Sequence, residues 1–231
     1  MGIISNQHDR VLFVSVHPDD ETFGCGGTIF KHQALGTHIY WLNLTGISTN
    51  HPYGYSSEFV NQVYEITQKV AAEYRFEDFI NLDFPTMLLD TVPYYELVNR
   101  IDKAITELKP NIIYIPNRSD VHTDHQIGFK AIYSCTKSFR KAYIKQILMY
   151  ETLSETEFAP ATQENVFCPN HFEDVSEYWE AKMAVIRLYE METMPEPLPR
   201  SIRAVNSLGA LRGSRIGANF AEAYTILFSM S

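Results

Sequence analysis

Short apolar runs recur along the chain with the length and composition of strands in a buried sheet. The first, VLFVSV at residues 11–16, contains a single polar residue, as is typical of a strand covered on both faces. Comparable runs predict further strands at residues 38–44, 79–82, 112–115 and 146–150. Each run is too short to form a helix of ordinary length, so the pattern favours strands.

The segments between these runs are longer and amphipathic. In residues 58–74, apolar side chains recur every three or four positions, which places them on one face of a helix. Residues 45–57, rich in Gly, Ser, Asn and Pro, and the prolines Pro195, Pro197 and Pro199 predict loops. Helices are predicted at residues 22–35, 58–74, 94–108, from about 123, and at 176–190. Strands that alternate with helices indicate an α/β fold with a mostly parallel sheet.

Length and composition fit a soluble single domain over residues 1–231. Hydrophobic residues make up 45% and charged residues 20% of the chain, and no apolar stretch approaches the ~20 residues of a membrane helix. The first ten residues lack the pattern of a signal peptide. Three scattered cysteines give no disulfide framework or paired-Cys zinc motif, so a reducing cytoplasm is the expected location.

The charge balance argues against nucleic acid as a partner. The formal net charge is −9 and the pI is about 5.3, whereas phosphate backbones bind basic surfaces. A small neutral or weakly charged substrate fits this balance better. The sequence leaves the oligomeric state open, and a homo-oligomer is compatible with it.

Two polar clusters follow predicted strands at their carboxyl ends. His17-Pro18-Asp19-Asp20 comes after the first strand, and a second cluster at residues 120–125 follows the strand that closes at Pro116. Because ligands bind at the carboxyl ends of parallel strands, both clusters are expected to open onto one crevice.

The two clusters together supply the donors of a metal site. Two imidazoles and one carboxylate form a catalytic zinc set, and the same donors suit Fe²⁺, Mn²⁺ or Co²⁺. Asp19 and Asp20 can divide the work, one binding metal and the other facing the bound water. One helical turn would bring His122 and His125 to the same side, and Asp124 could hold a ring N–H. The candidates are His17, Asp19, Asp20, His122, Asp124 and His125.

A purely structural interpretation of each cluster is available. Asp20 could cap the helix that follows, and the Asp of His122-Thr123-Asp124-His125 could be favoured by a helix dipole. The joint occurrence of both clusters at two strand ends favours a functional site. For the remaining histidines a surface or structural role is expected, with His51 the one that merits inspection. These are His8, His32, His38, His51 and His171.

The glycines that follow the first cluster do not form a nucleotide-binding motif. The pattern G-x-G-x-x-G would need a glycine at position 29, which is Ile29, and the acidic residues would repel a pyrophosphate. Gly24, Gly26 and Gly27 are therefore expected to allow close packing of the helix on the sheet.

The residues resemble the LmbE-like, or PIG-L-like, zinc-dependent N-deacetylases. The resemblance rests on residues 17–21 (HPDDE), on Gly24-Cys25-Gly26-Gly27, and on residues 122–125 (HTDH). It extends to residues 217–224, which resemble the family's late G-x-x-x-A-E-A-aromatic stretch. The match therefore runs from the first strand nearly to the end of the chain.

This resemblance implies a Rossmann-like three-layer fold without a nucleotide, and removal of acetyl groups from N-acetylglucosamine units in conjugates. It implies that Asp19 is the general base, that His122 stabilises or protonates the tetrahedral intermediate, and that Asp124 orients His122. The implied zinc ligands are His17, Asp20 and His125. Eukaryotic relatives have a membrane anchor, which is not expected in this chain.

One feature of the family is missing from the sequence. Many relatives carry an Arg early in the helix after the second strand, where it contacts substrate, and residues 58–63 contain none. Arg200 is the candidate substrate-binding cation, and a surface role is the alternative for it and for the other arginines considered. Those are Arg118, Arg212 and Arg215.

Two other functional classes stay open at this point. A metal-dependent phosphoesterase uses similar ligands, although usually with a second metal and more carboxylates. A non-catalytic metal- or sugar-binding module would hold zinc without releasing acetate.

Overall fold

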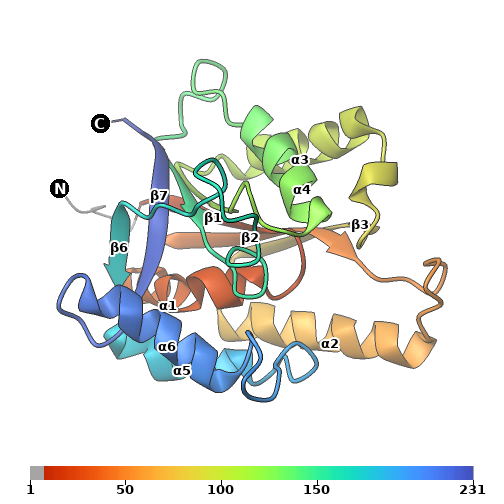
Figure 1. The fold of residues 1–231 in the computed structure, drawn as a ribbon. Coiled ribbons are helices and arrows are strands. Elements are labelled where there is room, and N and C mark those ends of the chain that lie inside the picture. The colour runs from red at the N-terminus through yellow and green to blue at the C-terminus, as the bar shows by residue number, and fades with distance from the viewer. Residues whose placement is uncertain (1–7, 231) are drawn as a thin grey trace.

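Seven strands form one mixed sheet within residues 8–230, the part of the chain that the computed structural model describes (Figure 1). Their order across the sheet is β3-β2-β1-β4-β5-β7-β6. The strands are β1 (Arg10–Ser15), β2 (His38–Gly46), β3 (Asp78–Pro85), β4 (Ile112–Pro116), β5 (Gln146–Tyr150), β6 (His171–Asp174) and β7 (Ala221–Ser229). The α-helices are α1 (Asp20–Leu35), α2 (Ser57–Glu73), α3 (Tyr94–Leu108), α4 (Thr123–Ser134), α5 (Trp179–Ile186) and α6 (Ile202–Ser214).

The strand order reverses beside β1. This strand pairs in parallel with β2 on one side and β4 on the other, so that Val11 lies opposite both Ile39 and Ile112. The strands from β3 to β5 are parallel, and only the pairings made by β7 are antiparallel. The connections that leave β1 and β4 diverge at their carboxyl ends, which opens a crevice at this point of the sheet.

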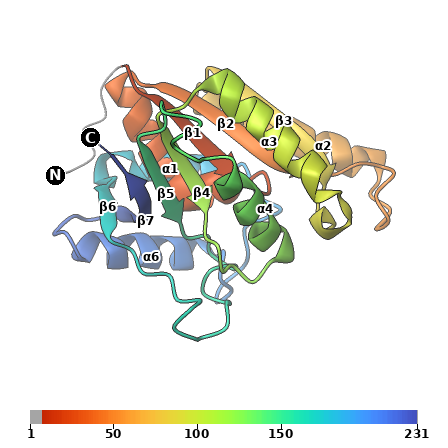
Figure 2. The ribbon, with the colours of Figure 1, turned by 90° about the horizontal axis from the view of Figure 1, so that it is seen from above.

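Helices cover both faces of the sheet, as the apolar runs indicate. Figures 1 and 2 show α3 and α4 on one face and α1, α2, α5 and α6 on the other. Alternate residues of β1 enter the two cores: Leu12 and Val14 pack in the α3–α4 layer, whereas Val11 and Phe13 pack in the α1–α2 layer. The α/β three-layer prediction is thus confirmed, and it explains why β1 is apolar at nearly every position.

The last third of the chain contains elements that the sequence patterns do not predict. These are the helix α6 and the strands β6 and β7. Some predicted boundaries also shift, and β3 runs three residues beyond the predicted end at residue 82. β2 continues through Thr45, which donates both its N–H and its hydroxyl to the Val16 carbonyl, and α1 begins at Asp20. The predicted helix at 176–190 is a 3₁₀ turn (Ser176–Tyr178) followed by α5.

Among the glycines of α1, one allows close packing on the sheet. A Cβ at Gly24 would lie 2.2 Å from a ring carbon of Tyr150 in β5. At Gly27 an added Cβ would instead lie 2.7 Å from Val175, in the segment before α5. An added Cβ at Gly26 would lie 2.8 Å from the Tyr74 hydroxyl. The prediction of helix-to-sheet packing therefore holds for Gly24 and is wrong for Gly26 and Gly27, which pack against other segments.

A buried ion pair also fixes α1 near its middle. Lys182 of α5 donates to the carbonyl of Phe23 (2.8 Å) and to the carboxylate of Glu222 (2.6 Å). The same carboxylate accepts the backbone N–H groups of Gly27 (2.9 Å) and Thr28 (2.8 Å). Glu222 belongs to β7 and to the late sequence stretch, so this stretch has a structural contact that ties the last strand to the first helix.

None of the helices in the described range is long and apolar enough to cross a bilayer.

Buried His32 predicts a loss of stability in mild acid. Burial disfavours the imidazolium and lowers the pKa of His32 to about 4. An unfolded chain protonates this ring near pH 6.5, so the unfolded state binds more protons between pH 6.5 and 4, and stability falls as the pH is lowered through that window. Between pH 7.5 and 5, the native protein should lose about 2 kcal/mol more unfolding free energy than His32→Gln.

Urea unfolding at the two pH values measures this difference. All other titrating groups are common to both proteins, so equal losses in the two would show that the His32 ring is not kept neutral by the fold.

Candidate active site

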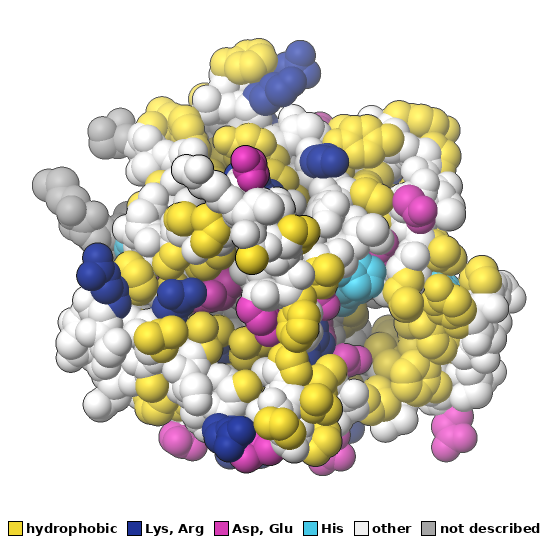
Figure 3. Space-filling model, viewed as in Figure 1, with side chains coloured by type: hydrophobic (Ala, Val, Ile, Leu, Met, Phe, Trp, Pro, Cys, Tyr) yellow, Lys and Arg dark blue, Asp and Glu magenta, His cyan; other side chains and the backbone are white. Residues whose placement is uncertain are grey.

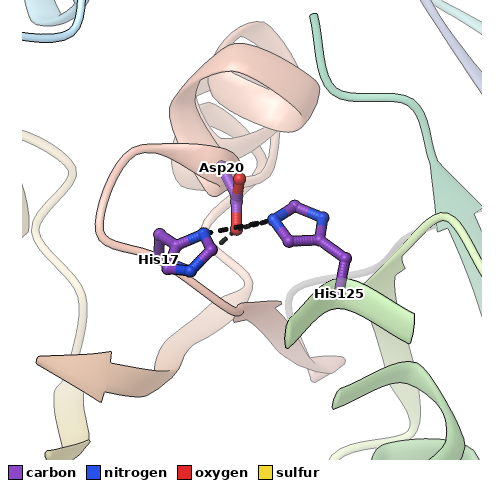
Figure 4. Close-up of side chains that lie close together, drawn as sticks. All are labelled: His17, Asp20 and His125. Atoms are coloured by element: carbon purple, nitrogen blue, oxygen red, sulfur yellow. Dashed lines mark hydrogen bonds and ion pairs between the residues drawn. The ribbon is translucent and has the colours of Figure 1, made fainter. Parts of the chain in front are cut away.

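Three side chains from the two polar clusters converge at the strand-order reversal. His17 follows β1, Asp20 is the first residue of α1, and His125 lies in the first turn of α4. The His125 Nε2 atom is 3.2 Å from His17 Nδ1 and 3.3 Å from Asp20 Oδ2 (Figure 4). Bonds of 2.0–2.1 Å in a tetrahedral zinc site separate neighbouring donor atoms by about 3.3 Å. The three donors therefore fit one divalent ion.

Asp20 is held by its own loop. Its Oδ2 atom accepts the N–H groups of Val16 (3.0 Å) and His17 (2.8 Å), while Oδ1 is buried and has no hydrogen-bond partner among the described residues. Burial alone would raise the pKa of this carboxyl, but the neighbouring His125 and His17 hold it below its usual value. The carboxylate does not cap α1. The loop thus holds the Asp20 carboxylate with Oδ2 facing the imidazoles, where a carboxylate oxygen that binds a cation would lie.

Asp120 orients His125. Its Oδ2 is 2.9 Å from His125 Nδ1, and its Oδ1 accepts from Asn117 and Thr156, both at 2.7 Å. Burial would lower the pKa of His125, but Asp20 and Asp120 together raise it to about 9. When the ring donates its Nδ1–H to Asp120 in a hydrogen bond, the Nε2 lone pair is available to bind a metal. The sequence analysis did not single out Asp120, although a carboxylate five residues before a candidate ligand is a usable signal.

Replacing Asp120 by Asn should weaken zinc binding by about 10- to 100-fold, because carboxylates behind metal-binding imidazoles typically have effects of this size. Competition with a chromophoric chelator measures the affinity. The matched control is Asp78→Asn, an exposed Asp at the start of β3. Equal affinities in the two variants would contradict the role of Asp120.

The Asp124 carboxylate contacts His17 and not the His122 ring that the family resemblance suggested. Its Oδ2 is 3.3 Å from His17 Nε2 and accepts the N–H of Met87 (2.6 Å), and its Oδ1 accepts the N–H of Leu89 (3.1 Å). These backbone donors, from the segment after β3, turn the carboxylate toward His17. Asp124 thus orients His17.

His122 is the N-cap of α4. Its Nδ1 accepts the backbone N–H of Asp124 (3.1 Å), so the neutral ring carries its proton on Nε2. Partial burial, with a further contribution from the charge of His17, lowers the pKa of His122 to about 4. The His17 and His122 rings lie 4.7 Å apart. A neutral imidazole with an Nε2–H beside the three donors can act as a hydrogen-bond donor at neutral pH.

Asp19 and Arg200 form a buried ion pair next to this cluster. Asp19 Oδ2 accepts from Arg200, and Asp19 Oδ1 is buried without a partner in the described part of the chain. Arg200 is only 6% exposed and also donates to Glu192 (3.2 Å) and Ser154 (2.8 Å). The alternative of a surface charge is therefore wrong for Arg200. Its contact with substrate stays a prediction, and the structure adds a contact with Asp19.

Two of the other arginines considered for substrate binding have partners elsewhere. Arg212 forms a two-pronged pair with Glu151 (2.7 and 2.6 Å), and Arg118 donates to the carbonyl of Glu164 (2.6 Å).

The cluster borders a cleft of about 350 Å³, which His17 lines, whereas Asp20 and His125 are buried behind it. Its lining includes His17, Asp19, His122 and Arg200. In Figure 3, hydrophobic side chains border a hollow in which acidic and histidine side chains are visible.

Histidines outside the clusters have structural contacts. His51 is buried, and its Nε2 is 2.8 Å from the Thr86 carbonyl. His38 pairs with Glu77, and His171 pairs with Glu173. These contacts agree with the structural role expected for them.

Several known proteins are similar to this chain in sequence and in fold. The diacetylchitobiose deacetylase of Thermococcus kodakarensis is 26% identical over 198 residues, which is 81% of this chain and 71% of the relative. The N,N′-diacetylchitobiose deacetylase of Pyrococcus horikoshii, solved with an inhibitor, superposes with a TM-score of 0.71 at 21% identity, over 94% of this chain and 83% of that one.

A third similar structure has a different activity. The 4-carboxy-2-hydroxymuconate hydratase of Pseudomonas putida KT2440 superposes with a TM-score of 0.73 at 15% identity, over 96% of this chain and 98% of that one. Structural similarity at these identities therefore shows the fold, and not the reaction.

A family model provides the stronger evidence. The model for GlcNAc-PI de-N-acetylase (PIG-L) matches residues 12–136, a range that contains both polar clusters. This range is more than half of the 231 residues, and the chain belongs to the PIG-L family.

Proposed function

We propose that the protein is a zinc-dependent N-deacetylase, which hydrolyses the N-acetyl group of an amino sugar or its conjugate to acetate and a free amine. The observation that carries the proposal is the spacing of His17, Asp20 and His125, at 3.2 and 3.3 Å, beside a carboxylate with one unpartnered oxygen. The family, and the deacetylase activity for which the Thermococcus relative is named, also support this proposal.

His17, Asp20 and His125 would hold the ion. When bound, a divalent ion of this kind supplies a Lewis acid for the amide carbonyl and makes water more acidic. Two imidazoles and one carboxylate leave room for water and substrate. Zinc is the first candidate, and Fe²⁺, Mn²⁺ and Co²⁺ suit the same donors.

Asp19 is the proposed general base. Arg200 holds one of its carboxylate oxygens, and the other, Oδ1, is free to take a proton from water that attacks the amide. The ion pair fixes the orientation of the carboxylate. The departing amine then takes up a proton from Asp19.

His122 is the proposed donor to the carbonyl oxygen. Its Nε2–H can stabilise the negative charge that develops there, a contribution typically worth about 3–4 kcal/mol per donor. A ring with a pKa of about 4 is neutral at pH 7, so it acts by donating a hydrogen bond and not by carrying charge.

The test is an assay for acetate and primary amine with a panel of N-acetylated amino sugars that includes N,N′-diacetylchitobiose. We expect both products in equal amounts, loss of activity with a chelator and recovery with zinc. Release of phosphate from phosphate esters would favour the phosphoesterase alternative. Full zinc occupancy without acetate from any member of the panel would favour a binding module or another reaction of this fold.

A further inference from the structure

The cleft around the candidate site is deficient in free positive charge. Of the described residues that line it, Arg200 is the only Lys or Arg, and its guanidinium is bonded to Asp19 and Glu192. Glu155 adds a further carboxylate to the lining. When ionised, Asp19, Asp20, Glu155 and Glu192 carry four negative charges, one more than the positive charges of Arg200 and a divalent ion together. A phosphate or carboxylate group on the substrate would therefore meet acidic side chains without a free cation to pair with.

The rest of the lining is largely apolar. Loop and helix residues from four segments contribute aliphatic and aromatic side chains to it. They are Ile47, Tyr55, Phe59, Val63, Met87 and Met194. A wall of this kind binds apolar groups, since removal of apolar surface from water is favourable.

The aromatic part of the wall is held in place from behind. The Tyr55 ring lies between His51, at 4.9 Å, and Phe59, with which it stacks at 5.6 Å. His51 is fixed by its contact with the Thr86 carbonyl. The backbone at Phe59 is fixed by the Ser56 cap of α2, whose hydroxyl accepts the Phe59 N–H, and its ring packs on Tyr55. The wall is thus formed before any ligand binds, which lowers the entropic cost of binding.

We propose that the conjugate bears an uncharged, apolar aglycone, alkyl or aromatic, that packs on Tyr55 and Phe59. This inference rests on the proposed deacetylation. Glu155, with one buried oxygen unpartnered among the described residues, accepts a hydroxyl of the sugar, while the aglycone covers the apolar wall. Anionic conjugates such as sugar phosphates are disfavoured by charge.

Methyl, propyl and pentyl glycosides of N-acetylglucosamine test the inference against two comparison substrates, N-acetylglucosamine 1-phosphate and N,N′-diacetylchitobiose. With the zinc-loaded protein, kcat/KM should rise about two- to fourfold per methylene, as expected for apolar burial. The sugar phosphate and the disaccharide should both be slower than the pentyl glycoside, the phosphate by about tenfold or more. A flat alkyl series, or faster turnover of either comparison substrate, would overturn the inference and leave deacetylation standing.

Two variants at one position locate the effect. Phe59→Ala should flatten the alkyl series, and Phe59→Arg should in addition raise kcat/KM for the sugar phosphate. Phe139→Ala, a matched change at a side chain that is 79% exposed and does not line the cleft, should keep the slope of the native protein. An unchanged slope in Phe59→Ala would overturn the placement of the aglycone.

Calorimetry separates this inference from the proposed function. It compares binding of pentyl glucosaminide and glucosamine 1-phosphate to the zinc-loaded protein and needs no turnover. If no substrate releases acetate but the pentyl compound binds more tightly, the aglycone preference stands and deacetylation falls. If the two compounds bind equally and no substrate releases acetate, both the aglycone preference and the proposed deacetylation are wrong.

Discussion

Asp19→Asn should bind zinc as the native protein does and turn over substrate about 10²–10⁴-fold more slowly, the range expected for loss of a general base. Asn has nearly the shape of Asp, and its carbonyl oxygen can still accept from Arg200. Its amide cannot take the proton from water that the free Oδ1 of Asp19 is placed to take. The change therefore removes proton transfer and leaves the donor atoms of the metal site in place.

Zinc content by elemental analysis and kcat from acetate release measure the two halves of this result. Asp78→Asn, in an exposed position, controls for loss of a carboxylate elsewhere. A variant at Asp19 that keeps kcat within threefold of the native value would remove Asp19 from the mechanism. Loss of zinc would instead place it among the ligands.

Asp20→Ala should lose zinc, with an affinity lower by about 10²–10³-fold, since sites with four ligands bind with about 10–16 kcal/mol, or roughly 3 kcal/mol per ligand. Activity should fall with occupancy and recover in part at high zinc concentration. In thermal unfolding, zinc should raise the melting temperature of the native protein and leave that of the variant nearly unchanged, because a ligand stabilises only the state that binds it.

Asp20 also accepts two backbone N–H groups, from Val16 and His17, so the alanine variant disturbs the loop as well. Asp20→Asn keeps an oxygen acceptor for these donors and removes the negative charge. It should therefore fold more stably than Asp20→Ala and still bind zinc weakly. Native affinity in Asp20→Asn would show that the carboxylate charge is not required, contrary to the proposal.

The parallel part of the sheet could be predicted because its strands are buried on both faces. Val11 and Leu12 belong to opposite cores, and both are apolar, so a short continuous run identifies the strand. β7 lacks this signal, because its second half is only partly buried. In α6, Gly209 weakens the helical pattern, and its reason is tertiary: a Cβ there would lie 2.2 Å from the Trp179 ring.

The part of the candidate site that depends on residue type and on position at a strand end could be predicted from the sequence. His17, Asp20 and His125 come together because their strands are neighbours at the order reversal. Their role as ligands is the proposal tested above. The contact of Arg200 with Asp19 joins positions 181 residues apart, and only the folded chain brings it about. The position of Asp124 depends on backbone donors after β3, which carry no signal in the sequence.

The bond between Glu222 and the middle of α1 has a consequence for how the protein matures in the cell. During synthesis, the loop with His17 and Asp20 leaves the ribosome about 200 residues before the strand that fixes the helix behind it. A nascent chain that still lacks β7 would have a loosely held α1. We therefore expect the chain to bind the metal ion only late in synthesis, after the C-terminal strand β7 has joined the sheet.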